Sequence, residues 1–239
     1  MEIKNAKFIV LDTETTGFDP KVDRVVEISL CKVSEQGVQP LFEALIDPQC
    51  KIPPEASAIH HITNKHVQGK PIFSQVWPIV SRYLEGSIVV AHNAMFDRSF
   101  LPEAELPWLC TMRLAHHLWP TAPKYSNQFL RYWLDLNIDD AGQAHSAAAD
   151  ALITGYILQR ELSEYQQRIA PRIPDGFGIE KLLSYAASHF EIQEMPFGKY
   201  KGVPISTIPL DYVRWVLENV VDLDPDLRWN LENVLFAVY

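Results

Sequence analysis

The order of its apolar segments restricts the fold of this chain more than any other feature of the sequence. Three short stretches rich in β-branched residues come first, at residues 8–11, 25–33 and 41–46, and turn residues separate them. From residue 73 onward, helical spacing alternates with two further strand-like segments, at 87–91 and 108–112. This order predicts an α/β chain with a mixed five-stranded sheet flanked by helices, not a purely parallel sheet.

Five segments have the residue spacing of helices. They are residues 73–84, which include Pro78, and residues 94–101, 112–118, 127–134 and 147–165. The helix expected at 94–101 follows the fourth strand directly, and the helix at 147–165 is the longest and most apolar. Side chains at the starts of these two helices are therefore expected at the carboxyl edge of the sheet, where open α/β sheets form their ligand crevices.

Composition excludes several classes of protein. Of the 239 residues, 47% are hydrophobic and 21% are charged, which excludes a disordered, collagenous or coiled-coil chain. No apolar run approaches the roughly 18 residues of a membrane span, and no membrane partner is expected. The three cysteines form no CxxC pair, so neither a disulfide framework nor a zinc knuckle is indicated. We expect a cytoplasmic protein.

The net charge of −9 argues against a protein that coats duplex DNA without sequence preference. Such proteins carry a basic face that neutralises phosphates. An acidic chain can still be a nucleic-acid enzyme, because a site rich in carboxylates recovers local positive charge when it binds divalent cations.

The composition changes near residue 170, where two prolines and two glycines lie close together. We expect a main domain at residues 1–168, a linker at 169–178 and a small, mainly helical C-terminal module at 179–239. Lys199 and Lys201 flank Tyr200 in this tail and could grip a nucleic-acid strand. The alternative is a small packed module, or a homodimer contact, built on Trp215 and Trp229.

Two carboxylates end the first predicted strand. Asp12 and Glu14 are two residues apart, and the period of a strand places both side chains on the same face. Like charges this close are unfavourable unless a cation or water separates them. Taken alone, the pair is more typical of a solvated turn.

Two further clusters follow the fourth predicted strand and open the long helix. Asp97 falls about one turn into the helix after that strand, and Asp150 lies near the start of the long helix, five residues after His145. Each has an ordinary alternative: an exposed helix acid for Asp97, and a surface or capping histidine for His145. Together the clusters offer four carboxylates to hold cations and one base near neutral pKa to deprotonate water, which is the set that two-cation phosphodiester cleavage requires.

At these residues the chain resembles the DnaQ-like 3′ to 5′ exonucleases, the DEDDh branch of the RNase H-like fold. The segment from Phe8 to Gly17 resembles the first motif of that family, His92-Asn-x-x-Phe-Asp97 the second and His145-x-x-x-x-Asp150 the third. The likeness covers about residues 5 to 165. The Ile59-His-His-Ile-Thr63 stretch and the tail with Phe197-Gly-Lys-Tyr-Lys-Gly202 resemble the exonuclease X type, although His61 stands where many relatives carry glycine.

The resemblance implies an RNase H-like sheet and a metal-dependent 3′ to 5′ exodeoxyribonuclease. Asp12, Glu14 and Asp150 would hold one Mg²⁺ or Mn²⁺, and Asp12 would bridge to a second ion together with Asp97. His145 would be the general base that activates water, and the product would be a nucleoside 5′-monophosphate. DNA repair or end trimming is the expected role.

The resemblance also implies contacts to the 3′ end of a nucleic acid, with DNA favoured over RNA. The implied substrate-binding residues are Thr13, Thr15, Thr16, Gly17, Phe18, His60, Ile62, Asn93 and Phe96. Phe18 is expected as an apolar wedge against the last base, since stacking on an aromatic ring tolerates any base; an ordinary turn aromatic is the alternative. An RNA-trimming exonuclease, a polymerase proofreading subunit and a non-catalytic nucleic-acid-binding scaffold stay open as alternative functions.

Overall fold

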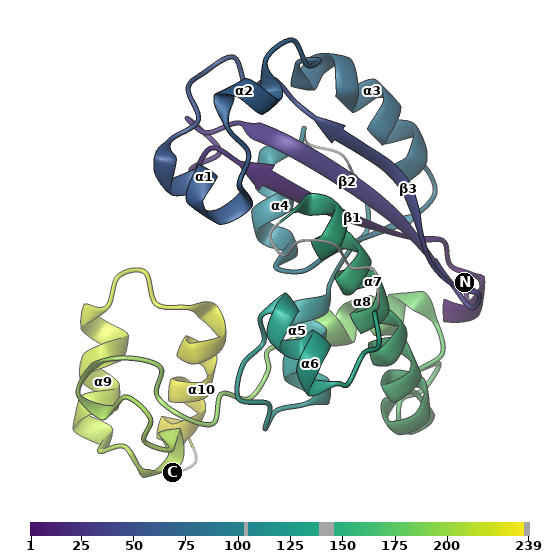
Figure 1. Ribbon diagram of the computed structural model, residues 1–239. Helices are drawn as coiled ribbons and strands as arrows, with labels where there is room; N and C mark the ends of the chain where they lie inside the picture. Colours follow the sequence, from purple (N-terminus) through teal and green to yellow (C-terminus); the bar gives the residue numbers. More distant parts are fainter. Residues whose placement is uncertain (103–104, 139–145, 237–239) are drawn as a thin grey trace.

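A five-stranded sheet with the order β3-β2-β1-β4-β5 organises the computed structural model, which describes residues 1–102, 105–138 and 146–236 (Figure 1). The strands are β1 (Phe8–Thr15), β2 (Val25–Ser34), β3 (Gly37–Leu45), β4 (Ile88–Ala91) and β5 (Trp108–Cys110). The β1–β2 and β2–β3 pairs are antiparallel, whereas the β1–β4 and β4–β5 pairs are parallel. The predicted mixed sheet is confirmed.

Helices flank this sheet and make up the C-terminal part of the chain. They are α1 (Pro54–His60), α2 (Asn64–Val67), α3 (Phe73–Leu84), α4 (Ala94–Phe100), α5 (Thr111–Leu118), α6 (Asn127–Trp133), α7 (Ala147–Glu164), α8 (Ile179–Ala187), α9 (Leu210–Asn219) and α10 (Pro225–Phe236). The five helices predicted from spacing agree with α3, α4, α5, α6 and α7 to within one residue at each end. Pro78 lies inside α3, as predicted.

The sheet buries a different apolar cluster on each face. Val10 of β1 belongs to the cluster that contains Ile157 of α7, whereas its neighbour Ile9 belongs to the cluster that contains Val80 of α3. All four side chains are fully buried, and burying an aliphatic side chain contributes about 1.5–3 kcal/mol. The period of two in β1 therefore decides which residues face α7.

This alternation continues to the end of β1 and positions the predicted site. Asp12 and Glu14 follow Val10 on the α7 face, and their partners on β2 are Ser29 and Glu27. The register shifts between Glu14 and Thr15, where a bulge ends the regular pairing of the two strands. The strand extends to Thr15, four residues beyond the predicted segment 8–11.

The segment expected to be a linker packs with the main domain instead. The Ile3 amide donates to the Phe177 carbonyl, and the Ile179 amide donates to the Met1 carbonyl, so residues 177–179 are bound to the N-terminus of the chain. Ile179 and Leu182 of α8 belong to the same apolar cluster as α7. The apolar core of the main domain therefore includes α8, so the change to a separate core comes after this helix and later than the predicted boundary at residues 169–178.

A second apolar core forms beyond α8. Its buried members are Met195, Ile205, Ile208, Val213, Val216, Leu223, Leu227 and Leu231. This core is aliphatic. Trp215 is 52% exposed and Trp229 stacks on His189, so neither tryptophan is the centre of the module. The contact of Lys199 and Lys201 with a nucleic-acid strand, and a homodimer contact, stay predictions.

The C-terminal module is attached to α5 by an ion pair between the partly exposed Arg113 and the buried Asp226. The Arg113 guanidinium donates to both oxygens of Asp226 at 2.6 and 3.1 Å, and also to the Ser188 carbonyl at 2.8 Å. His189 Nδ1 contacts the same carboxylate at 2.8 Å. In Figure 1, α10 accordingly lies between α9 and the main domain. Among the helices that the structure describes, none has both the length and the apolar character needed to cross a membrane.

Candidate active site

Three carboxylates from two elements meet at the end of β1. Asp12 and Glu14 of β1 and Asp150 of α7 each bring one oxygen to a group whose members all lie within 4.8 Å of one another. Hard divalent cations such as Mg²⁺ and Mn²⁺ prefer oxygen ligands of this kind. The structure thus brings together residues 136 to 138 positions apart in the sequence, as the motif pattern predicts.

Asp97 approaches the same strand from α4. Its Oδ1 accepts hydrogen bonds from the Thr13 amide at 3.0 Å and from the Thr13 hydroxyl at 2.8 Å, and its side chain is buried. The Asp97 carboxylate is therefore fixed beside Asp12, although it is not one of the three acids with oxygens within 4.8 Å of each other. Thr13, which was predicted to contact substrate, uses its hydroxyl to hold Asp97.

Asp150 is supported by α6, which lies beside the start of α7. Gln128 Nε2 donates to Asp150 Oδ1 at 3.2 Å, and Asn127 Nδ2 donates to the Asp150 carbonyl at 3.0 Å. Gln128 thus holds the carboxylate of Asp150, and Asn127 holds its backbone. Neither residue stands out in the sequence, because an amide pair in a short helix has many ordinary uses.

The acids perturb one another strongly. Burial, and then the charges of Asp97, Asp150, Glu14 and Glu27, raise the pKa of Asp12 well above its usual range. Burial and the same kind of repulsion raise the pKa of Glu14 to about 8. Burial raises the pKa of Asp97 to about 7, although the hydrogen bonds from Thr13 oppose that shift. A cluster that resists carrying its full negative charge is suited to a divalent cation, which removes this repulsion.

We expect the thermal stability of the metal-free protein to fall as the pH rises from about 6.5 to about 8. Glu14 keeps its proton to about pH 8 when folded but releases it near 4.5 when unfolded, so the folded state binds more protons in this interval. His92 and His116, whose pKa values burial lowers to about 4, oppose this trend near pH 6.5, because the unfolded histidines are still about half protonated there, but they add little above about pH 7.5. The midpoint of thermal unfolding, measured with and without Mn²⁺, tests this.

Mn²⁺ should raise that midpoint more at pH 8.5 than at pH 6.5, because the ion competes with protons for the carboxylates. The same experiment on Glu14→Gln should show a weaker dependence on pH. An unfolding midpoint that is independent of pH between 6.5 and 8 without metal would contradict the proposed state of the cluster.

The predicted base, His145, lies outside the described residues. Ser146, the next residue, is the N-cap of α7, and its hydroxyl accepts a hydrogen bond from the Ala149 amide at 3.2 Å. Asp150 follows in the first turn of this helix.

The turn after β1 is built by its own threonines. Thr15 donates its hydroxyl to the Gly17 carbonyl at 2.6 Å, and Thr16 donates its hydroxyl to Asp23 at 2.9 Å. The Thr16 amide already donates to the Arg24 carbonyl. A Cβ atom on Gly17 would lie 2.5 Å from the Asp23 carboxylate, so only glycine permits this close approach.

Phe18 extends from this turn and is 79% exposed, which is far more than an ordinary turn aromatic that packs against the protein. The centroid of its ring lies 6.1 Å from the ring centroid of Phe96 on α4. The Phe96 centroid in turn lies 5.0 Å from that of Phe100. Asn93 is the N-cap of α4 and adopts a left-handed conformation with φ of 65°. These predicted substrate-binding residues from two segments are thus neighbours at one end of the sheet.

The predicted pocket residues of the α1 region have different surroundings. His60 ends α1 and is buried; its Nδ1 accepts from the Ile62 amide at 3.0 Å, and its Nε2 has no partner among the described residues. Ile62 is also buried and packs with Val26 and Ile52. His61 has φ of 62°, the left-handed region that glycine adopts more readily than histidine.

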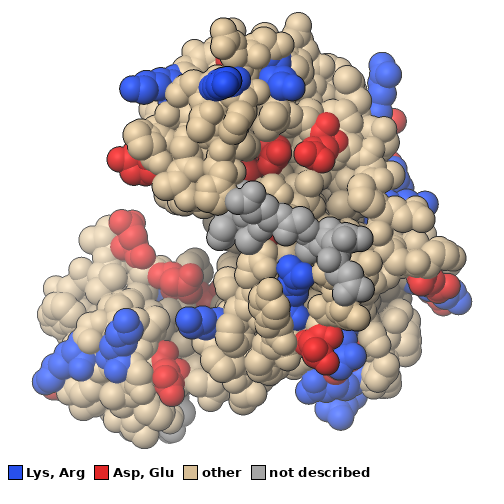
Figure 2. All heavy atoms as spheres, in the orientation of Figure 1, with Lys and Arg blue, Asp and Glu red and all other residues tan. Residues whose placement is uncertain are grey.

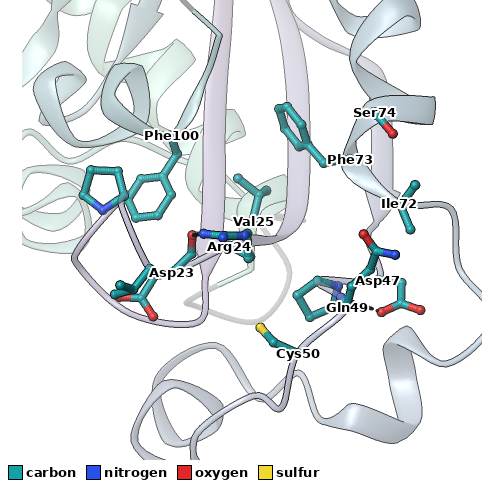
Figure 3. Close-up of a pocket in the computed structure, with 13 residues that line it drawn as sticks. Asp23, Arg24, Val25, Asp47, Gln49, Cys50, Ile72, Phe73, Ser74 and Phe100 are labelled. Carbon is teal, nitrogen blue, oxygen red and sulfur yellow. Dashed lines mark hydrogen bonds between the residues drawn. The ribbon is translucent and has the colours of Figure 1, made fainter.

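A cavity of about 550 Å³ lies beside the β1–β2 turn and is separate from the carboxylates (Figure 3). Asp23 and Arg24 line it from the turn, and the rings of Phe73 and Phe100 approach it from α3 and α4. None of the four acids lines this cavity. It therefore adjoins the candidate site without containing its chemistry.

The side of the molecule drawn in Figure 2 shows no broad basic face among the described residues. Lysine and arginine side chains are dispersed among acidic ones on this side. This agrees with the net charge of −9. Binding of phosphates on this side would therefore depend on individual lysine and arginine side chains and not on an extended basic surface.

Sequence reasoning also missed Glu27, a buried acid on β2 opposite Glu14. Its side chain accepts a hydrogen bond from the Ala147 amide at 2.7 Å, at the first residue of α7. The available signal was a single charged residue inside the apolar run from Val25 to Cys31, whose seven residues are all buried.

The sequence matches known protein families and a curated relative. The model of a family described as exonuclease (RNase_T) matches residues 9–158, and the model of a quorum-sensing-regulated virulence factor family matches residues 187–220. Exodeoxyribonuclease 10 of Escherichia coli (strain K12) is 32% identical over 231 residues, which cover 95% of this chain and 97% of that protein.

Two solved structures share the fold. Exonuclease X in complex with 5′ overhanging duplex DNA superposes with a TM-score of 0.60 and 36% identity, covering 72% of this chain and 99% of that one. The nuclease domain of 3′hExo, a DEDDh family member bound to rAMP, has a TM-score of 0.56 and 14% identity, covering 69% of this chain and 95% of that one. The second likeness shows the fold alone.

Proposed function

Since the chain belongs to the exonuclease family whose model matches residues 9–158, we propose that it removes nucleotides from the 3′ end of DNA by a two-cation mechanism. The observation that carries the proposal is the meeting of Asp12, Glu14 and Asp150 within 4.8 Å, with Asp97 held beside them by Thr13. A scaffold that only binds nucleic acid has no use for this acidic group, which repels phosphate unless cations neutralise it.

DNA is the substrate that the relatives favour. The relative from Escherichia coli is named an exodeoxyribonuclease, and the exonuclease X structure contains duplex DNA with a 5′ overhang. By this similarity we assign DNA rather than RNA, and a role in repair or end trimming. An RNA-trimming exonuclease and a polymerase proofreading subunit share the same chemistry and are the alternatives that the substrate assay separates.

The acidic group fits two divalent cations, Mg²⁺ or Mn²⁺, because its donors are all carboxylate oxygens and because burial, together with repulsion from the neighbouring acids, raises the pKa values of Asp12 and Glu14. Asp12, Glu14 and Asp150 would hold one ion, and Asp12 and Asp97 the other. When bound, such ions activate water and neutralise charge on the attacking and leaving oxygens of the phosphodiester.

The side chains of this chain would then orient the reaction. His145 would accept a proton from the attacking water as general base, and the bond to the 3′ oxygen of the next nucleotide would break, which releases a nucleoside 5′-monophosphate. Phe18 would lie against the terminal base, which agrees with its exposure of 79%. Asn93, Phe96 and His60 would complete the pocket for the 3′ end.

A labelled-substrate assay tests this function. The purified chain is incubated with 5′-labelled single-stranded DNA, blunt duplex, mismatched duplex and RNA, each with Mg²⁺, Mn²⁺ or EDTA. We expect a stepwise ladder that shortens from the 3′ end of DNA and disappears with EDTA. Internal cuts, shortening from the 5′ end, or products that persist in EDTA would reject the proposal. Efficient cleavage of RNA but not of DNA would instead support the RNA-trimming alternative.

A further inference from the structure

Glu27 is a buried acid beside the candidate site that the proposed mechanism does not use. It lies in β2 between apolar neighbours and is 5% exposed. In the β1–β2 register it pairs directly with Glu14, and its side chain points to the same face of the sheet. A buried carboxylate is costly unless it is hydrogen-bonded, so its partner indicates why an acid occupies this position.

The partner is the backbone at the start of α7. Glu27 Oε2 accepts a hydrogen bond of 2.7 Å from the amide of Ala147, the first residue of that helix. The Ser146 hydroxyl accepts from the Ala149 amide at 3.2 Å. Two amides that cannot bond within the helix are thus satisfied, one by the N-cap and one by a neighbouring strand. The partial positive charge at a helix N-terminus also favours a carboxylate there.

This bond fixes α7 to the strand pair that carries the acidic cluster. Ala147 is three residues before Asp150, and Glu27 is the cross-strand partner of Glu14. A shift of the first turn of α7 away from β2 would carry Asp150 away from Asp12 and Glu14, whose oxygens now lie within 4.8 Å of it. The same helix start also follows His145 directly in the sequence.

We propose that Glu27 is a positioning residue that anchors the first turn of α7 through the Ala147 amide and so keeps Asp150 within the cation-binding group. The expected effect on DNA cleavage rests on the proposed function, whereas the expected effect on Mn²⁺ affinity does not. Glu27 itself touches neither substrate nor cation in this account. The hydrogen bond, not the negative charge alone, is what positions the helix.

The test compares two replacements of Glu27 by Mn²⁺ titration of the full chain and by the kinetics of DNA cleavage. Glu27→Leu removes the acceptor, and we expect Mn²⁺ affinity and kcat to fall by about tenfold or more, the range typical for residues that orient metal ligands. Glu27→Gln keeps an oxygen acceptor at the same place, and we expect it to restore both to within about threefold. The KM for DNA should change little in either variant, since no substrate contact is removed.

Glu161→Leu is the matched control. Glu161 is also a fully buried acid, and it lies on α7, but neither of its side-chain oxygens has a hydrogen-bond partner among the described residues. Its replacement should leave Mn²⁺ affinity unchanged. The control separates the role of the Ala147 contact from a general effect of removing a buried acid near this helix.

Ala147→Pro provides a second route if Glu27→Leu does not fold. Proline is tolerated at the first residue of a helix, and Ser146 already has the extended conformation that precedes proline. Its ring carbon replaces the amide proton that now points at Glu27, so the variant breaks the same contact from the side of the helix. This variant should also weaken Mn²⁺ binding by about tenfold, with Glu27 intact. Wild-type Mn²⁺ affinity in Glu27→Leu or Ala147→Pro, or equal loss in Glu27→Gln and Glu27→Leu, would overturn the proposal. Failure of the exonuclease assignment would instead appear as an inactive wild-type protein that binds Mn²⁺ normally.

Discussion

Asp150→Asn is expected to reduce the rate of DNA cleavage by about a thousandfold while the protein remains folded. Asp150 is the only member of the acidic group that α7 contributes, so its replacement removes an anionic ligand opposite Asp12 and Glu14. A thousandfold loss corresponds to about 4 kcal/mol of transition-state stabilisation, which is within the several kcal/mol that metal ions supply in hydrolysis.

The fold should tolerate this change. Asparagine has nearly the volume of aspartate, and its amide oxygen can still accept from Gln128 Nε2, now at 3.2 Å from Asp150 Oδ1. Removing one carboxylate also relieves the repulsion that raises the pKa of Glu14. The unfolding midpoint of the metal-free variant should therefore equal or exceed that of the wild type, whereas its gain from Mn²⁺ should be smaller.

Single-turnover cleavage of labelled DNA measures the loss of rate in Asp150→Asn, and thermal unfolding measures its stability. Glu164→Gln is the control on the same helix, because Glu164 lies at the other end of α7 from Asp150 and pairs with Arg160 and Arg168. It should cleave at the wild-type rate. A folded Asp150→Asn protein with wild-type activity would show that the acidic group is not the catalytic centre.

Local patterns in the sequence were sufficient to predict the placement of the acids. A strand has a period of two, so Asp12 and Glu14 had to share a face, and apolar neighbours such as Val10 decided that this face meets α7. The helix signals were equally local: α3 matches its prediction at Phe73 and Leu84 despite Pro78. The end of β1 was placed too early because Asp12-Thr-Glu14-Thr is polar, as a turn is, and only the acidic site explains polar residues in a buried strand.

Contacts between distant segments could not be predicted in this way. The segment at 169–178 has the prolines and glycines of a linker, but a hydrogen bond from the Ile3 amide to the Phe177 carbonyl attaches it to the N-terminus. Arg113 of α5 binds Asp226 of the C-terminal module, 113 residues further along the chain. Glu27 and Ala147 are 120 residues apart. No periodicity relates such pairs, so only the fold reveals them.

His145→Ala is the second change with a large expected effect. A general base contributes about 10²- to 10⁴-fold to the rate of a hydrolysis, and we expect a loss in that range for cleavage of the terminal phosphodiester. The loss should be in kcat at nearly unchanged KM, because a base that acts on water adds little to the binding of DNA. Mn²⁺ affinity should also stay at its wild-type value, since the three acids that lie within 4.8 Å of one another are untouched.

The pH dependence of the rate separates a base from a structural histidine. An ordinary histidine has a pKa near 6.5, so the wild-type rate should rise through that region as His145 loses its proton. In His145→Ala this rise should disappear, and only the dependence that comes from competition between protons and metal ions for the acids should remain. His66→Ala is the control, because exposed His66 only caps α2 through the Thr63 amide. A His145→Ala protein that keeps the wild-type rate and pH profile would assign the proton transfer to another group, and the acids alone would then have to account for catalysis.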